Sequence, residues 1–63
     1  NFSTYLRKIR IEKSKKLLID TDLNLLDIAI TVGFNNQNYY SMVFKKYTNM
    51  SPSKYRTSIS LEE

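Results

Sequence analysis

The sequence predicts an all-α fold in which one long helix is followed by three shorter helices. In each segment, apolar residues recur at the three- and four-residue spacing of an amphipathic helix. The 63 residues include a single glycine and a single proline, so few positions interrupt helical structure. With 41% hydrophobic residues, this composition favours a small helical domain over a disordered tail or a β-sandwich rich in turns.

Composition also excludes several kinds of chemistry. The chain has no histidine and no cysteine, which removes disulfides, Cys/His zinc sites, thiol nucleophiles and histidine acid–base catalysis. We therefore expect no cofactor and no metal. There is no apolar run of membrane-spanning length and no signal-peptide pattern, so we expect a soluble, cytoplasmic protein without a membrane partner. Because it opens on Asn1, we expect the chain to be part of a longer protein.

Residues 1–20 are predicted to form one long helix. They contain no glycine or proline, and the Asn1 side chain can cap a free backbone N–H at the start. Two apolar stripes run along this helix, and the rest of the chain can cover only one of them. We infer a preceding subdomain that covers the other stripe; oligomerisation through it is the alternative. The stripes are Phe2, Tyr5, Leu6, Ile9 and Leu17 on one side, and Ile11, Ser14 and Leu18 on the other.

A short second helix is predicted over residues 25–32. It follows a turn at residues 21–24, in which Asn24 is the expected cap. Gly33 comes directly after it, where a helix end favours a residue that adopts positive φ without steric cost. Phe34 is then expected in the core. The core face of this helix has the spacing i, i+3, i+4, i+7 and comprises Leu25, Ile28, Ala29 and Val32.

A third helix is predicted over residues 36–47, with Asn35 or Asn36 as its cap. Its two sides differ in chemistry, and the outward side is mostly uncharged and rich in hydrogen-bonding groups. The buried side comprises Tyr40, Val43, Phe44 and Tyr47, and the outward side Gln37, Asn38, Ser41, Met42 and Lys45.

A final helix is predicted within residues 51–59. Asn49 can adopt the left-handed conformation that ends the preceding helix. Ser51 and Pro52 supply a cap and a first-turn proline. In this helix we expect Tyr55 to point inward and Lys54 or Arg56 to point outward.

The second and third helices predict a helix-turn-helix at residues 24–47, because the glycine turn and the small Ala29 let two helices pack closely. With the last helix they form a homeodomain-like three-helix unit. The third helix could then enter a major groove of DNA. There, Asn and Gln pair with adenine, Ser donates or accepts, and Met contacts a thymine methyl. Ordinary solvated surface is the alternative interpretation of this polar face.

Charge is arranged in blocks along the chain. Residues 1–16 contain six Lys or Arg and one Glu, residues 17–34 contain three Asp and no cation, and residues 35–56 contain four Lys or Arg and no acid. Two basic blocks around an acidic one suit a polyanion held at several points, such as double-stranded DNA. Helix faces that are merely solvated are the alternative explanation.

Several stretches of the chain carry a resemblance to a known family. They are residues 5–13 with Leu17-Leu18, Ile28-Ala29, Val32-Gly33-Phe34, Tyr39-Tyr40-Ser41, residues 44–47 and residues 51–56. On these stretches, residues 5–56 resemble the C-terminal DNA-binding domain of the AraC/XylS family of bacterial transcription regulators. The departures from the family pattern are Ser14, Tyr40 and Asn49, where alanine, phenylalanine and glycine are commoner, and Met42 at a frequently polar or basic position.

The resemblance implies two helix-turn-helix units, each with a recognition helix in the major groove. Residues 1–20 would be the helix that connects them and residues 24–47 the second unit. The first unit and an effector or receiver domain would precede Asn1. By this resemblance the base-reading residues are Gln37, Asn38, Ser41 and Met42. The expected phosphate contacts, from the same resemblance and the charge pattern, are Asn36, Lys45, Lys46, Lys54 and Arg56.

We therefore predict sequence-specific DNA binding as part of a bacterial transcription regulator, without catalysis. The alternative is a protein-interaction module that contacts RNA polymerase or a partner domain through Asp20, Asp22 and Asp27. An enzyme is the poorest interpretation, because the acids lie on separate elements and no nucleophile–base pair or metal cluster occurs in the sequence.

Overall fold

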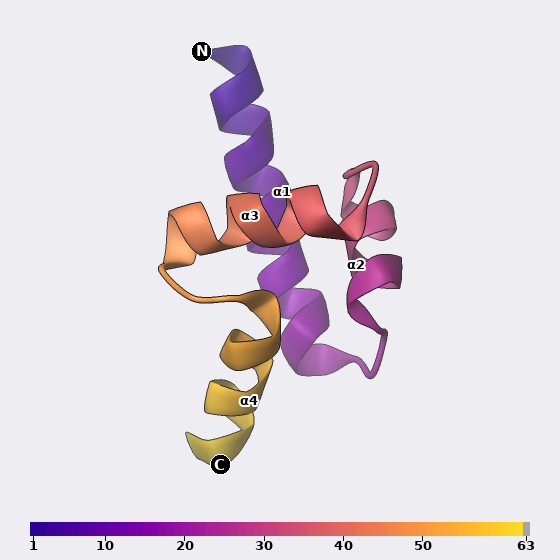
Figure 1. The fold of residues 1–63 in the computed structure, drawn as a ribbon, viewed down its shortest axis with the longest axis vertical. Helices are drawn as coiled ribbons and strands as arrows, with labels where there is room; N and C mark the ends of the chain where they lie inside the picture. Colours follow the sequence, from indigo (N-terminus) through magenta and orange to yellow (C-terminus); the bar gives the residue numbers. More distant parts are fainter. Residues whose placement is uncertain (63) are drawn as a thin grey trace.

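The computed structural model describes residues 1–62, which form four α-helices and no strand. They are α1 (Phe2–Asp20), α2 (Leu25–Val32), α3 (Gln37–Thr48) and α4 (Pro52–Glu62). α1 runs along the long axis of the molecule and contacts each of the other three helices, and α3 crosses over it (Figure 1). The predicted all-α architecture, with a long helix ahead of a three-helix unit, is confirmed. Along residues 1–62, no helix combines the length and apolarity that a membrane crossing needs.

Every described helix begins at a side-chain cap that the sequence predicts. The Asn1 Oδ1 atom accepts from the Thr4 amide at 2.9 Å. The same arrangement recurs at Asn24 for α2, at 2.8 Å, and at Asn36 for α3, at 2.7 Å. At α4 the Ser51 Oγ atom accepts from the Lys54 amide at 3.1 Å. Each cap satisfies one of the backbone donors that a helix start leaves unpaired.

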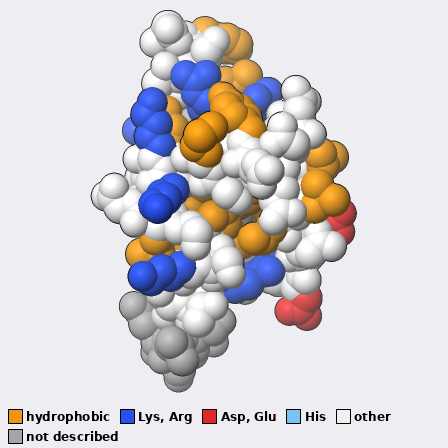
Figure 2. All heavy atoms as spheres, in the orientation of Figure 1, with side chains coloured by type: hydrophobic (Ala, Val, Ile, Leu, Met, Phe, Trp, Pro, Cys, Tyr) orange, Lys and Arg blue, Asp and Glu red, His pale blue; other side chains and the backbone are white. Residues whose placement is uncertain are grey.

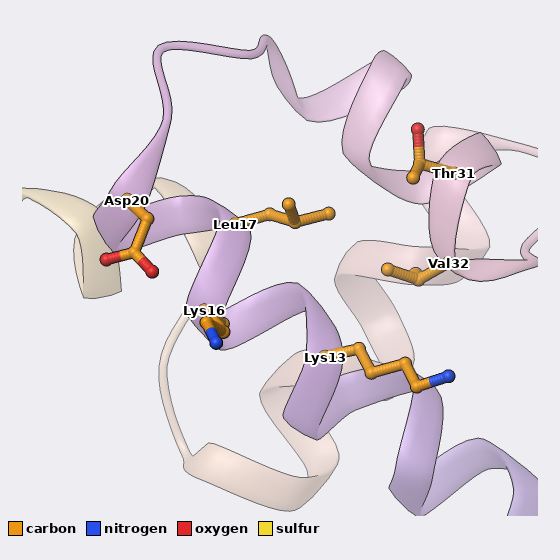
Figure 3. A pocket seen from close by; sticks show the side chains of 6 residues that line it. All are labelled: Lys13, Lys16, Leu17, Asp20, Thr31 and Val32. Atoms are coloured by element: carbon orange, nitrogen blue, oxygen red, sulfur yellow. The ribbon is translucent and has the colours of Figure 1, made fainter.

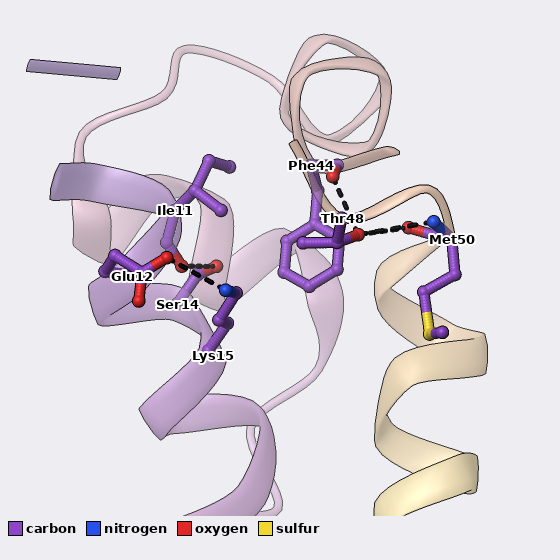
Figure 4. A network of polar contacts seen from close by, with 7 residues as sticks. All are labelled: Ile11, Glu12, Ser14, Lys15, Phe44, Thr48 and Met50. Atoms are coloured by element: carbon purple, nitrogen blue, oxygen red, sulfur yellow. Dashed lines mark hydrogen bonds and ion pairs between the residues drawn. The ribbon is translucent and has the colours of Figure 1, made fainter. Parts of the chain in front are cut away.

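The helix ends use the two residues expected to adopt positive φ. Gly33 has φ 113° after α2, and Asn49 has φ 65° after α3. At Gly33 the chain reverses so that the Phe34 amide donates to the Ala29 carbonyl at 2.8 Å, a bond that closes the helix end and turns Phe34 inward. After α3, the Thr48 hydroxyl lies between the Phe44 carbonyl and Met50 and orders the turn into α4 (Figure 4).

The hydrophobic core lies where α1 meets the other helices. One of the two stripes of α1 is buried, and it includes Ser14, whose hydroxyl donates to the Ile11 carbonyl at 2.8 Å (Figure 4). On the other stripe, Phe2 and Tyr5 are 75% and 60% exposed, whereas Leu17 packs against the core. The buried core residues are Ile11, Leu18, Ile28, Ala29, Phe34, Tyr40, Val43 and Phe44.

The structure corrects the sequence-based expectations in three places. α3 begins at Gln37 and ends at Thr48, because Asn36 is its cap and the helix continues one residue beyond Tyr47. α4 continues past residue 59 to Glu62, since no helix-breaking residue follows Pro52. Tyr47, expected in the core, is only half-buried at its edge, as are Leu25 and Val32 from the expected core face of α2.

Candidate nucleic-acid interface

The outward side of α3 carries the four residues expected to read bases. Gln37, Asn38 and Met42 are exposed, and Ser41 is half-buried beside them. Met42 has 64% of its surface accessible, although its side chain is apolar. The four therefore share one side of a single helix, and their role as base-reading residues stays a prediction.

Cations border this outward side. Lys45 and Lys46 are exposed in the last turn of α3, and Lys54 is exposed on α4. Among residues 1–59, whose side chains the structure describes, the single ion pair joins Lys15 to Glu12, so these three lysines have no acidic partner there. In the view over α3, Lys and Arg side chains gather along the N-terminal half of α1 and the C-terminal end of α3, and acidic ones lie at the opposite edge (Figure 2).

Asn36 and Arg56, the other two expected phosphate contacts, have partners inside the fold. The Asn36 side-chain oxygen caps α3, which leaves its amide nitrogen free to donate outward. Arg56 Nε donates to the Leu18 carbonyl at 2.9 Å, and its Nη2 donates to the Thr21 carbonyl at 3.1 Å. Arg56 is thus a tie between α4 and the end of α1, and a phosphate contact from its remaining N–H groups stays a prediction.

A continuous row of aromatic rings supports α3 from beneath. The Phe34 and Tyr40 ring centroids are 5.4 Å apart, those of Tyr40 and Phe44 5.8 Å, and those of Phe44 and Tyr55 5.4 Å. Tyr39 adds an edge-on contact to Phe34 at 5.7 Å. Such tilted and edge-on pairs favour defined orientations, so the row fixes α3 on the turn before it and on the helix after it.

One buried hydroxyl in this row lacks a good partner. Tyr40 is fully buried and its Oη atom makes no hydrogen bond of acceptable geometry. Burial raises the pKa of Tyr40, against smaller opposing effects of the neighbouring Ser14 hydroxyl and the Arg56 guanidinium. Because the Ser14 hydroxyl already donates to the Ile11 carbonyl, its oxygen can only accept from Tyr40. The phenol therefore stays protonated and weakly paired.

Two open grooves flank α1. The first lies between α1 and α3, has a volume of about 370 Å³, and brings Arg7 to the edge of the outward side of α3. Arg7 belongs to the basic block at residues 1–16 that is expected to favour a polyanion, but its place beside α3 could not be predicted, because no local pattern shows where α3 crosses α1. The second, of about 340 Å³, lies between α1 and α2, away from α3; Leu17 and Val32 form its apolar floor and Lys13, Lys16 and Asp20 its rim (Figure 3).

The described residues offer no set of three or more acidic side chains close enough to hold a metal ion. What the surface of α3 presents is hydrogen-bonding groups and positive charge. That combination suits noncovalent recognition of a polyanion.

Comparison with known proteins gives the relationships of the chain. The family model described as "Helix-turn-helix domain" matches residues 1–58. The chain is 39% identical over 59 residues to the bifunctional transcriptional activator/DNA repair enzyme AdaA of Bacillus subtilis, an alignment that covers 94% of the chain and 28% of that protein. It is 44% identical over 52 residues to the melibiose operon regulatory protein of Escherichia coli, covering 82% of the chain and 17% of that protein.

A solved structure has the same fold. The C-terminal domain of AraT, a response regulator from Geobacillus stearothermophilus, matches with a TM-score of 0.89 and 43% identity, over 92% of this chain and 48% of that one. The chain thus spans 28% and 17% of the two curated relatives and about half of the solved domain. The family match, these relatives and the arrangement of the four helices agree, and the chain belongs to the AraC/XylS-type helix-turn-helix family of bacterial transcription regulators.

Proposed function

We propose that this chain binds double-stranded DNA sequence-specifically as part of a bacterial transcription regulator, with α3 in the major groove. The observation that carries the proposal is the outward side of α3, where amide and thioether groups are exposed, the Ser41 hydroxyl is half-buried beside them, and exposed lysines border them. An α-helix with its side chains is about 10–12 Å across and the major groove is about 12 Å wide, so the groove admits the helix closely.

The base-reading side chains and the phosphate-contacting side chains would have different roles. Gln37 and Asn38 can form paired hydrogen bonds with adenine, and each good pair discriminates against a wrong base by about 1–3 kcal/mol. Ser41 and Met42 would add a hydroxyl contact and an apolar contact to a thymine methyl. Asn36, Lys45, Lys46, Lys54 and Arg56 would contact phosphates, which positions the helix and makes the affinity depend on salt.

The wider protein is also part of the proposal. The solved relative is about twice as long as the matched region, and Phe2 and Tyr5 leave an apolar side of α1 exposed. We propose that a first helix-turn-helix unit covers this side, and that an effector or receiver domain supplies the signal. The regulator would act on DNA in the bacterial cytoplasm, by binding and without catalysis.

The proposal is tested by titrating the full-length gene product with duplexes enriched from a random library and with a scrambled duplex, at several salt concentrations. Asn38→Ala should weaken binding of the enriched duplex by about 1–3 kcal/mol and leave the scrambled duplex unaffected. Lys45→Gln is the matched control, because it should weaken both duplexes equally. Equal affinity of the unmodified protein for both duplexes, or affinity independent of salt, would contradict the proposal.

A contact with RNA polymerase is the second candidate function, and one surface favours it. Asp20, Asp22 and Asp27 are exposed at the α1–α2 connection. On α2, Leu26 and Ile30 lie one turn apart and are 48% and 53% exposed. Acidic side chains around exposed apolar ones suit a basic, partly apolar protein partner.

Charge reversal separates this role from DNA binding. Asp22→Lys combined with Asp27→Lys should abolish transcription activation while the affinity for the enriched duplex stays within twofold or rises. Asp22→Asn with Asp27→Asn is the milder control for loss of charge without reversal. Unchanged activation in the reversed variant would remove this candidate.

A further inference from the structure

The groove between α1 and α3 joins the outward side of α3 to the connecting helix. It has a volume of about 370 Å³ and an apolar, aromatic wall with one cation from each helix. Its lining is Arg7 from α1 and Tyr39, Met42, Val43, Lys46 and Tyr47 from α3. We refer to these six residues as the α1–α3 groove.

The cations of the groove are not used by the fold. Lys46 is exposed and Arg7 half-exposed, and neither forms an ion pair with an acid among residues 1–59, the part of the chain whose side chains are described. The hydrogen bond recorded for Arg7 runs from Nη2 to the Thr4 hydroxyl at 3.5 Å, the long limit of such bonds. Two like charges at one groove repel each other, so the groove gains from an anion that both can contact.

The position of the α1–α3 groove indicates which anion it would bind. A helix that fills the major groove has a sugar–phosphate strand along each of its edges, because helix and groove have nearly the same width. Met42 belongs both to the outward side of α3 and to the α1–α3 groove, so the groove starts where that outward side ends. Arg7 stands across the groove from Lys46, on the side from which a flanking strand would arrive.

We propose that Arg7 and Lys46 together hold one backbone phosphate of the DNA strand that flanks α3, with the phosphate seated in the α1–α3 groove. This inference rests on the proposed function. The apolar wall strengthens the attraction by lowering the local dielectric constant, and the Tyr39 and Tyr47 hydroxyls can donate to phosphate or sugar oxygens. α1, which the family resemblance implies is a connecting helix, thereby contributes to binding, in agreement with the basic charge of residues 1–16, and the contact fixes how deeply α3 enters the major groove.

The test is the salt dependence of DNA affinity, measured with the full-length gene product on the enriched and the scrambled duplex. Arg7→Gln and Lys46→Gln should each weaken both duplexes by the same factor. The logarithmic salt slope changes by about 0.9 for each B-DNA phosphate that is neutralised. If the two cations share one phosphate, Arg7→Gln/Lys46→Gln should make the slope shallower by about 0.9 in total. A salt slope shallower by about 1.8 in the double variant would mean that the two cations contact separate phosphates, and would overturn the proposal.

Two further variants control for charge and for folding. Lys16→Gln removes a cation from the same helix on the side away from α3, and should leave the slope unchanged. Arg7→Lys keeps the charge and should retain most of the affinity. Far-ultraviolet circular dichroism should show the same helix content in all variants, because neither Arg7 nor Lys46 is buried.

The outcomes separate this inference from the function on which it rests. If Asn38→Ala still loses discrimination while Arg7→Gln, like Lys16→Gln, leaves the affinity for both duplexes unchanged, the inference is wrong and the proposed function stands. If the unmodified protein binds neither duplex in a salt-dependent way, both are wrong. Weaker binding of both duplexes by Arg7→Gln, with discrimination intact and a slope change of about 0.9 for Arg7→Gln/Lys46→Gln, supports both.

Discussion

Arg56 on α4 donates hydrogen bonds to backbone carbonyls at the C-terminal end of α1, one of them the carbonyl of Leu18. The Arg56 Nε atom donates to the Leu18 carbonyl at 2.9 Å, and Nη2 donates to the Thr21 carbonyl at 3.1 Å. The neighbouring Leu17 carbonyl is satisfied by the amide and hydroxyl of Thr21. A helix end leaves its last carbonyls unpaired, and a cation there also interacts favourably with the helix dipole. One arginine thus fixes the last helix against the first.

Replacing Arg56 should therefore reduce stability in addition to any effect on DNA binding. Arg56→Met keeps much of the side-chain volume and removes both hydrogen bonds, at an expected cost of about 2 kcal/mol in the free energy of unfolding. Arg56→Lys keeps the charge and cannot reach both carbonyls in the same geometry, so it should recover only part of that loss. Urea unfolding followed by circular dichroism measures this. If Arg56→Lys is as stable as the unmodified protein, the two hydrogen bonds from Arg56 do not stabilise the contact between α4 and α1.

The buried phenol of Tyr40 should cost stability. A buried hydroxyl without a full hydrogen bond is unfavourable by about 1–3 kcal/mol, so Tyr40→Phe is expected to raise the free energy of unfolding by roughly 1 kcal/mol. If the Ser14 hydroxyl partly pairs with the phenol, Ser14→Ala should destabilise the unmodified protein more than it destabilises the Tyr40→Phe variant. Thermal unfolding of the four proteins in this double-mutant cycle gives the coupling. Loss of stability in Tyr40→Phe would show that the phenol is fully paired.

Alkaline pH should unfold the protein partly through Tyr40. Burial raises the pKa of Tyr40 in the folded state above the ordinary phenol value of 10.0. As pH rises, the unfolded chain therefore releases this proton first. Below about pH 10 the proton has no effect on the free energy of unfolding, and that free energy falls as pH rises through the folded-state pKa. Tyr40→Phe should lose less stability than the unmodified protein between about pH 9 and 11. Parallel pH profiles would contradict this.

Gly33 should tolerate no ordinary side chain. Its φ of 113° is a conformation that L-residues rarely adopt, and a Cβ there would lie 2.7 Å from Arg10 Nε. The Arg10 guanidinium lies over the Phe34 ring, with Cζ 6.0 Å from the ring centroid. The Arg10 side chain can move, so backbone strain should dominate and Gly33→Ala should cost about 1–2 kcal/mol. Gly33→Asn should cost less. If Arg10→Ala restores Gly33→Ala fully, the clash and not the backbone is responsible.

Local features of this protein could be predicted from the sequence. Asn1, Asn24 and Ser51 cap the helices that they precede, and the i, i+3, i+4, i+7 pattern places Ile28 and Ala29 in the core. These succeed because capping and amphipathic periodicity involve residues three or four positions apart. The helix-turn-helix followed from the same short-range signals.

The features that depend on helices crossing could not be predicted in this way. The Arg56–Leu18 bond joins residues 38 positions apart, and the α1–α3 groove exists only because α3 lies over α1. The sequence indicated that Arg56 could face outward; the unpaired carbonyls at the end of α1 give it partners inside the fold instead. For the candidate site, the amphipathic pattern predicts which residues share the outward side of α3. It does not predict that Arg7 on α1 lies beside them.

The lone Lys15–Glu12 ion pair has a consequence for how the protein would respond to osmotic stress. Among the described side chains of residues 1–59 it is the only such pair, and it joins a half-exposed lysine to an exposed glutamate one helical turn away, so added salt removes little stability from the fold. Contacts between lysines and phosphates, in contrast, weaken steeply as cations compete for the DNA. For the DNA binding proposed above, a rise in potassium concentration would therefore weaken the complex while leaving the protein folded and able to rebind when the ion concentration falls.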